Sequence, residues 1–295
     1  MKKVIIYFSV LFFILSACTK LDEEVFDKIP GDQYPENENQ VSNLSVEAYT
    51  KLKPFADDEG WWFLAQEISS DEFCAPTRGA DWYDGGKWLN VHRHTWSNDE
   101  ESVNRMWGTM WTGVTTCNQV LDMLSDMAET EAIKAKRKEV ECLRAFYYYT
   151  LIDNYGDVPY LTSAKNAPEF PYKAKRVDVY TNLINTLESS LPYLKAYDNK
   201  LMFTKYTAYA LLAKLYINAE IYTGTPQWEK AGQYCDSVIS GPYQLATNVS
   251  DPFKTLNSNS PEIIFLIPYD EDNFTGFRIH MRTLHYQQNL EFDMT

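Results

Sequence analysis

The chain has 295 residues, of which 45% are apolar and 23% charged, with 41 acidic against 27 basic side chains. This apolar share, with only 12 Gly and 13 Pro, excludes disordered and collagen-like chains, because the protein can bury enough surface to offset the entropy of ordering. A net charge of −14 excludes proteins that bind by neutralising phosphates, so we expect no nucleic-acid partner. Eight Trp, 21 Tyr and 15 Phe exceed what a core of this size requires, so we expect some rings at a working surface.

The first 17 residues have the pattern of an export signal. Lys2 and Lys3 precede an apolar run from Val4 to Leu15, which is shorter than the about 20 residues of a transmembrane helix. Leu15-Ser16-Ala17-Cys18 then resembles a bacterial lipobox, after which the cysteine is acylated and becomes the mature N-terminus. We therefore predict a signal peptide over residues 1–17 and lipidation at Cys18. The alternative is ordinary secretion with Cys18 unmodified.

Residues 18–44 are predicted to be an extended, lipid-anchored leash, because acids and prolines dominate and apolar periodicity is weak. The rest of the chain, residues 45–295, is expected to be one helical domain. Its last part, residues 243–295, shows no long helical period.

The central part of the chain, residues 101–242, has the apolar period of amphipathic helices. Apolar residues recur at steps of three and four from Glu101 to Leu124. Four further helices are expected from Thr130 to Tyr155, from near Asp178 to Leu194, from a Thr204 cap to Ala219, and from Thr225-Pro226 to Gly241. The pattern predicts helical hairpins, and the last pair has about the 34-residue length of a tetratricopeptide unit.

Residues 56–100 lack a helical period and are predicted to form a loop-rich insertion that carries function. The segment from Ala75 to Trp88 brings large rings together with an arginine and acids. Sugar rings present apolar C–H faces edged by hydroxyls, so flat aromatic side chains with polar groups at their rims suit a carbohydrate. The candidate ligand contacts here are Arg78, Asp81, Trp82, Tyr83 and Trp88. The alternative is that the tryptophans pack inward and fix the loop to the scaffold.

The remaining histidines, tryptophans and cysteines do not form a recognisable metal, ligand or disulfide pattern. His92 and His94 would share one face of a strand, but no third metal ligand stands at a recognisable spacing, so we predict neither a metal nor a cofactor. Trp107 and Trp111 have helical spacing and are expected in the core. Export permits disulfides, yet no CxxC spacing relates the four cysteines that follow Cys18, and helical positions favour buried thiols for three of them: Cys117, Cys142 and Cys235, but not Cys74.

Several ordered blocks resemble the SusD/RagB family of Bacteroidetes outer-membrane lipoproteins. The blocks are Arg144 to Tyr148 with Tyr155 to Pro159, Lys205 to Tyr216 with Trp228 to Ala231, and Ser260 to Phe265, preceded by the lipobox, Ser70 to Glu72 and Trp107 to Leu121. The resemblance implies an all-α-dominated fold of tetratricopeptide-like helical hairpins, and we expect a short strand near residues 262–267. Family members are longer, so we expect the C-terminal part of this chain to be incomplete.

The resemblance also implies a function. Such a lipoprotein captures oligosaccharide at the outer membrane, facing the cell exterior, and delivers it to a TonB-dependent SusC-like transporter. In the family, rings from the early loop and from the region after Ser260 to Phe265 line the glycan site. Here the second set would come from Tyr269, Phe274, Phe277 or Tyr286.

Two other functions stay open. The protein could be a purely structural lid of the transporter, with its rings at the interface. It could also be a surface glycosidase, but the many acids form pairs by chance and no catalytic pair or nucleophile motif stands out, so we predict no enzyme.

Overall fold

A computed structural model of the chain describes residues 38–56, 61–77, 79, 83–196 and 199–279. The predicted signal peptide, Cys18 and most of the predicted leash lie outside these residues. The chain divides into two compact units, Met1–Gln40 and Val41–Thr295, and the features below belong to the second apart from the first three residues of helix α2.

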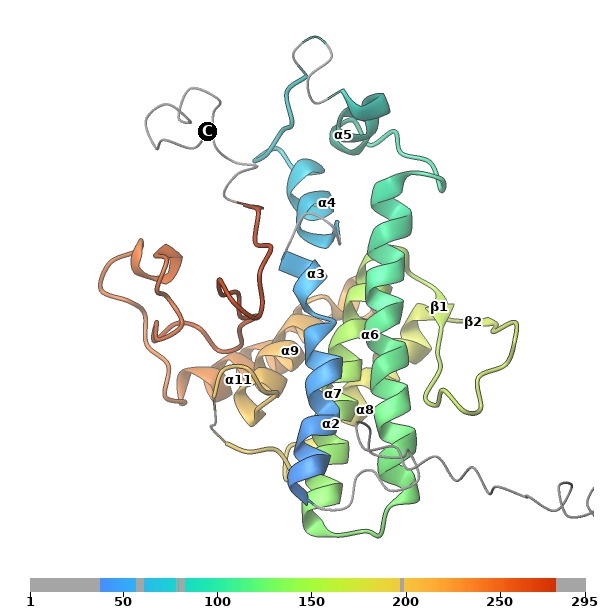
Figure 1. Cartoon of the computed structure of the whole chain (residues 1–295), viewed down its shortest axis with the longest axis vertical. Helices are drawn as coiled ribbons and strands as arrows, with labels where there is room; N and C mark the ends of the chain where they lie inside the picture. The colour runs from blue at the N-terminus through green and yellow to red at the C-terminus, as the bar shows by residue number, and fades with distance from the viewer. Residues whose placement is uncertain (1–37, 57–60, 78, 80–82, 197–198, 280–295) are drawn as a thin grey trace, which may run out of the picture. The chain divides into compact units, whose positions relative to one another are not determined.

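The described residues form a helical structure, as predicted (Figure 1). The helices are α2 (Glu38–Thr50), α3 (Lys53–Ala56), α4 (Trp62–Ile68), α5 (Lys87–His92), α6 (Glu101–Asp126), α7 (Glu131–Tyr155), α8 (Arg176–Ser190), α9 (Lys205–Ile217), α10 (Ala219–Thr223) and α11 (Trp228–Ile239). Two short strands, β1 (Val158–Pro159) and β2 (Lys173–Ala174), pair antiparallel with Val158 opposite Ala174. None of the described helices is long and apolar enough to cross a bilayer.

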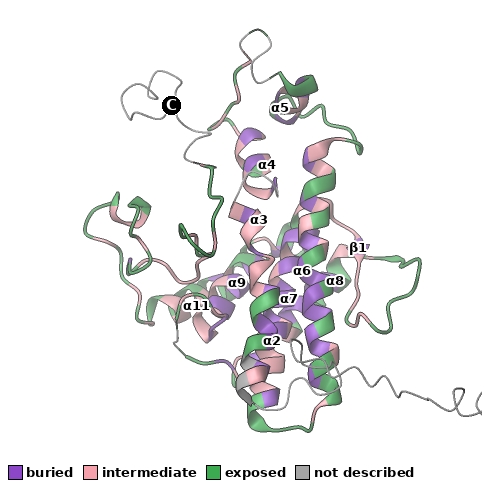
Figure 2. Ribbon diagram, viewed as in Figure 1, coloured by how far each residue is buried: buried purple, intermediate pink, exposed green. Residues whose placement is uncertain are grey.

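The core lies between the long helices, where α6 packs on α7 and α7 on α8, while α9 pairs with α11 (Figure 2). Helices α6 and α7 approach closely at Gly113, because a Cβ there would lie 2.2 Å from Cε1 of Tyr147. The Tyr147 ring is fully buried, and its hydroxyl donates a hydrogen bond to the Ala48 carbonyl at 2.8 Å. The predicted helical hairpins are thus confirmed.

Local signals explain where several helices begin and end. The Thr130 hydroxyl accepts a hydrogen bond from the Ile133 N–H at the start of α7, and Gly156 closes it with a φ of 74°. Thr204 caps α9, where its side chain and that of Thr207 form a reciprocal capping box. These boundaries agree with the sequence prediction.

Other predicted boundaries were wrong. Helix α11 begins at Trp228 rather than at Thr225-Pro226, and α8 ends at Ser190, so Leu194 is buried outside a helix. Residues 262–267 form no strand. Leu266 donates a backbone hydrogen bond to the Lys200 carbonyl at 2.9 Å, but a strand requires a ladder of such bonds and an isolated one does not form it.

Helices also occur where loops were predicted. Helices α4 and α5 lie within residues 56–100, and α2 begins at Glu38, inside the predicted leash. Helix α2 buries Val41, Leu44 and Ala48, whose spacing of three and four places them on one face.

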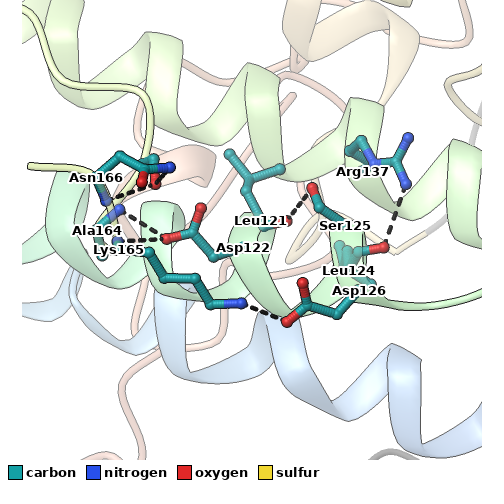
Figure 3. A network of polar contacts seen from close by, with 10 residues as sticks. Leu121, Asp122, Leu124, Ser125, Asp126, Arg137, Ala164, Lys165 and Asn166 are labelled. Carbon is teal, nitrogen blue, oxygen red and sulfur yellow. Dashed lines mark hydrogen bonds and ion pairs between the residues drawn. The ribbon is translucent and has the colours of Figure 1, made fainter.

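The loop that follows β1 is fixed to α6 by polar contacts (Figure 3). One carboxylate oxygen of Asp122 accepts hydrogen bonds from the Ala164 N–H at 2.7 Å and the Lys165 N–H at 2.9 Å. The Lys165 ammonium also forms an ion pair with Asp126. The buried Arg144 guanidinium adds a hydrogen bond to the Thr162 carbonyl at 2.8 Å. The loop is therefore held to the helical core at several points.

Candidate functional site

The predicted aromatic loop is described only in part. Arg78, Asp81 and Trp82 lie outside the described residues. Tyr83 precedes a short 3₁₀ turn, Asp84–Gly86, and its side chain is 51% exposed. Of the predicted loop contacts that the structure describes, Tyr83 is therefore the one with an accessible ring.

Trp88 does not offer a surface to a ligand, which corrects the sequence expectation. It is only 5% exposed, and its ring stacks on Trp61 with centroids 4.7 Å apart and planes 26° apart. Its indole N–H donates a hydrogen bond to the Asp84 carboxylate at 2.7 Å. Because its ring is buried and its only polar group is paired, Trp88 fixes α5 onto the scaffold, as the alternative interpretation proposed.

The second predicted ring set forms a cluster close to α3. Tyr269 contacts Phe274 and Phe277, with centroid distances of 5.9 and 5.1 Å, and its hydroxyl donates to the Lys53 carbonyl. The Lys53 ammonium lies 5.3 Å from the Phe274 centroid. Phe277 is exposed, whereas Tyr269 and Phe274 are half-buried. Tyr286 lies outside the described residues.

A cavity of about 420 Å³ is lined by residues from the start of α6, the end of α7, and α4 and α5. Its volume lies in the range of about 300–1,000 Å³ that is typical of small-molecule sites. The lining residues are all uncharged: Ala65, Gln66, Ser69, Val91, Trp96, Ser97, Asn98, Ser102, Val103, Met106, Asn154 and Tyr155.

Trp96 supplies an aromatic surface at this cavity. It is 46% exposed, and its ring lies beside that of His94, with centroids 5.5 Å apart. The two residues before Trp96 are anchored, since a ring nitrogen of His94 lies 2.7 Å from the Ser69 carbonyl and the Thr95 N–H donates to the Asn90 carbonyl at 2.9 Å. Because the backbone next to Trp96 is already ordered, less conformational entropy is lost when its ring contacts a ligand.

Amide side chains stand beside Trp96. The Gln66 amide donates a hydrogen bond to the Asn154 side-chain oxygen at 2.6 Å, and Asn154 in turn donates to the Thr150 carbonyl at 2.7 Å. The Asn98 carbonyl accepts a bond from the Asn104 side chain at 3.2 Å. Among the described residues, no hydrogen-bond partner occupies the side-chain amide of Asn98, so both its donors and its acceptor can serve a ligand.

Tyr155 forms part of the wall. Its hydroxyl donates to the Val103 carbonyl at 2.6 Å, which ties the end of α7 to the start of α6. Burial raises the pKa of Tyr155 well above its ordinary value, so the hydroxyl stays protonated at neutral pH. Trp107 packs edge-on to this ring at 4.9 Å, and Trp111 packs edge-on to Tyr148 at 6.0 Å. Both tryptophans, expected in the core, are half-buried in the contact between α6 and α7.

The described histidines and cysteines form no metal-ion site and no disulfide. His92 ends α5 rather than lying on a strand, and its ring nitrogen lies 3.3 Å from the Ile68 carbonyl. No group of three His, Cys, Asp or Glu side chains in the described ranges could hold a metal ion. The described cysteines are free thiols, with Cys117 and Cys142 buried but Cys235, expected to be buried, exposed like Cys74.

The sequence analysis did not select Trp96, because it is a single tryptophan in a segment that has neither apolar periodicity nor other large rings close by. The available signal was its neighbourhood, Thr95-Trp96-Ser97-Asn98, in which a large ring stands among small polar residues directly before a long helix.

Comparison with known proteins identifies the family. A SusD-like family model, described as "Starch-binding associating with outer membrane", matches residues 34–217. The chain belongs to the SusD-like family. The starch-binding protein SusD of Bacteroides thetaiotaomicron is 27% identical over 189 residues, which cover 60% of this chain and 32% of that protein. SusD-like protein P25 of Formosa agariphila is 23% identical over 286 residues, covering 92% of this chain and 52% of that protein.

Solved structures show the same fold. A SusD superfamily protein from Bacteroides vulgatus aligns with a TM-score of 0.67 at 20% identity, over 78% of this chain and 49% of that one. Surface glycan-binding protein A from B. thetaiotaomicron, solved in complex with laminarihexaose, aligns with a TM-score of 0.65 at 23% identity, over 80% and 50%. The chain thus spans about half of the length of these SusD-like proteins, and about a third of SusD itself.

Proposed function

We propose that this SusD-like protein is a non-enzymatic, lipid-anchored glycan-binding protein of the outer membrane, facing the cell exterior. It captures oligosaccharide and delivers it to a TonB-dependent SusC-like transporter. The observation that carries the binding proposal is the cavity beside Trp96, where an exposed ring adjoins uncharged amide and hydroxyl side chains. Sugars combine apolar C–H faces with hydroxyl edges, and this lining offers a partner for each.

Two further findings support the proposal. The family description names starch binding and association with the outer membrane, and the structural neighbour that contains laminarihexaose has the same fold. The predicted signal peptide and the predicted lipidation at Cys18 support an anchored protein, and two acyl chains would make that anchoring stable.

Contacts beyond the cavity extend the proposed site. We assign them to Tyr83, Tyr269 and Phe274, together with the predicted loop residues Arg78, Asp81 and Trp82. Trp88 is left out because its ring is buried.

Calorimetry or affinity electrophoresis against a panel of polysaccharides tests the proposal. Replacing Trp96 by Ala should cost about 2 kcal/mol of binding free energy, the usual effect of removing a central aromatic contact, or roughly a 30-fold loss of affinity. The matched control is Trp228→Ala, which removes an exposed tryptophan from α11, outside the cavity, and should leave binding unchanged.

Three outcomes would count against the proposal. Equal binding by the wild-type protein and Trp96→Ala would show that the cavity beside Trp96 is not the glycan site. Absence of binding to every glycan, with co-purification of a barrel partner, would instead favour a purely structural lid. Release of reducing sugar by the purified protein would favour a glycosidase.

A further inference from the structure

We infer that the cavity beside Trp96 selects neutral saccharides, meaning sugar chains without carboxylate, sulfate or phosphate groups. The inference deepens the proposed function and rests on it. It starts from the lining, in which every polar side chain is an amide or a hydroxyl and no described lining residue carries a charge.

Three acidic residues adjoin the cavity lining in sequence. Asp99 and Glu100 follow Asn98 directly, and Glu101 begins α6 one residue before the lining residue Ser102. Glu100 accepts a hydrogen bond from the Asn90 side chain at 2.5 Å, a neutral partner that leaves its charge in place. In the described part of the chain, no ion pair neutralises Asp99 or Glu100.

Two cations close to these acids, Lys87 and Arg105, are already engaged by Glu101. The Lys87 ammonium lies 2.9 Å from one Glu101 carboxylate oxygen, and the Arg105 guanidinium lies 2.8 Å from the other. The hydrogen bond from Lys87, with both positive charges nearby, lowers the pKa of Glu101 despite its partial burial. Neither cation is left to receive an anionic ligand.

This distribution of charge decides between classes of sugar. A sugar hydroxyl that leaves water can donate to and accept from the amides of Gln66 and Asn98, so its hydrogen bonds are replaced. A carboxylate or sulfate ester would lose its hydration with no cation among the lining residues to pair with, and burying an unpaired charge is costly. Border acids within a Debye length of about 8 Å at physiological salt would add repulsion.

Pairs of oligosaccharides that differ only at C6 provide the test. An array of neutral and acidic glycans first identifies the sugar backbone that binds. Laminarihexaose and maltohexaose are then titrated by calorimetry at low and high salt, each beside its counterpart oxidised at C6 to the carboxylate. If the array selects another backbone, that neutral oligosaccharide and its C6-oxidised form replace these two. The neutral member should bind at least about 100-fold more tightly than its oxidised counterpart. Equal or tighter binding of the oxidised chain would overturn the inference.

A charge introduced at the border adds a second readout. Asn98→Lys should raise affinity for the oxidised oligosaccharide by about tenfold or more, and high salt should abolish the gain. The matched control, Asn182→Lys on α8, makes the same change of net charge at an exposed asparagine outside the cavity and should have no such effect. An equal gain from both variants would show that overall charge, not the cavity, discriminates.

A third experiment tests Arg93, because it is an exposed cation close in sequence to Trp96. Arg93→Ala should leave binding of the neutral sugar unchanged. If the array returns only acidic glycans and Arg93→Ala abolishes their binding, the inference fails while the proposed function stands. If no glycan binds at all, the proposed function fails and this inference fails with it.

Discussion

The contact between Gly113 and Tyr147 allows a sharp test of how α6 and α7 pack. A methyl group at residue 113 would lie 2.2 Å from Cε1 and 2.3 Å from Cζ of the Tyr147 ring, well inside any real contact distance. The ring cannot easily move away, because its hydroxyl is bonded to the Ala48 carbonyl and Phe55 packs against it with centroids 5.7 Å apart. Gly113→Ala must therefore shift the helices or displace the ring.

The expected magnitude follows from three opposing effects. Alanine gains up to about 1 kcal/mol over glycine in a helix interior. Overpacking a core costs about 1–3 kcal/mol, and loss of the Tyr147 hydrogen bond adds about 0.5–1.5 kcal/mol. The steric effects win, so Gly113→Ala should lower the free energy of unfolding by roughly 0.5–3.5 kcal/mol.

Guanidinium unfolding followed by circular dichroism at 222 nm measures this change. The matched control is Gly108→Ala in the same helix, where no atom lies within 4 Å of the added methyl group. That variant should be more stable than the wild-type protein, by up to about 1 kcal/mol. If Gly113→Ala proves as stable as the wild-type protein, or if both variants shift in the same direction, the close approach of α6 and α7 is wrong.

Of three further predictions, two are tested by unfolding and one by chemical labelling. Thr204→Ala removes the α9 capping box and should cost about 1 kcal/mol of unfolding free energy, whereas the exposed Thr181→Ala on α8 should cost less. Burial raises the pKa of Asp122, but its hydrogen bonds from backbone N–H groups and the Ser163 side chain outweigh this and lower the pKa below 3.8. The stabilisation is thus present above that value and is lost as the pH falls through the lowered pKa. Asp122→Asn should cost about 1 kcal/mol at pH 7, and the difference should shrink in unfolding experiments below pH 4; a constant difference would contradict this. Because burial raises the pKa of Cys117 and Cys142 to about 12, maleimide labelling with peptide mass spectrometry at pH 7 should modify Cys74 and Cys235 quickly and the buried pair only after unfolding.

The long helices could be predicted from sequence because their signals are redundant. Helices α6 and α7 repeat their apolar spacing over many turns, and Thr130 and Gly156 mark the two ends of α7. Helices α4 and α5 have seven and six residues, too few for a helical period to stand out from the surrounding rings. The prediction of a strand near residues 262–267 was wrong for another reason: a strand forms only with a pairing partner elsewhere in the chain, which the local sequence does not reveal.

The candidate site was less predictable than the fold. A dense group of rings suggested the loop before α5, but composition cannot say which ring faces inward, and tertiary packing placed Trp88 against Trp61. Trp96 became a candidate only when α4, α6 and α7 were seen to converge beside it. Such a cavity joins residues from distant parts of the sequence, as the 2.6 Å hydrogen bond between Gln66 and Asn154 illustrates.

The antiparallel arrangement of α6 and α7 also separates the cavity from a convenient attachment point. The 26 residues of α6 run from the cavity to the turn at residues 127–130, a distance of about 39 Å at 1.5 Å per residue. Ala128 in that turn is exposed. A fluorophore coupled to Ala128→Cys would therefore label the protein without obstructing the proposed sugar site at the far end of the helix.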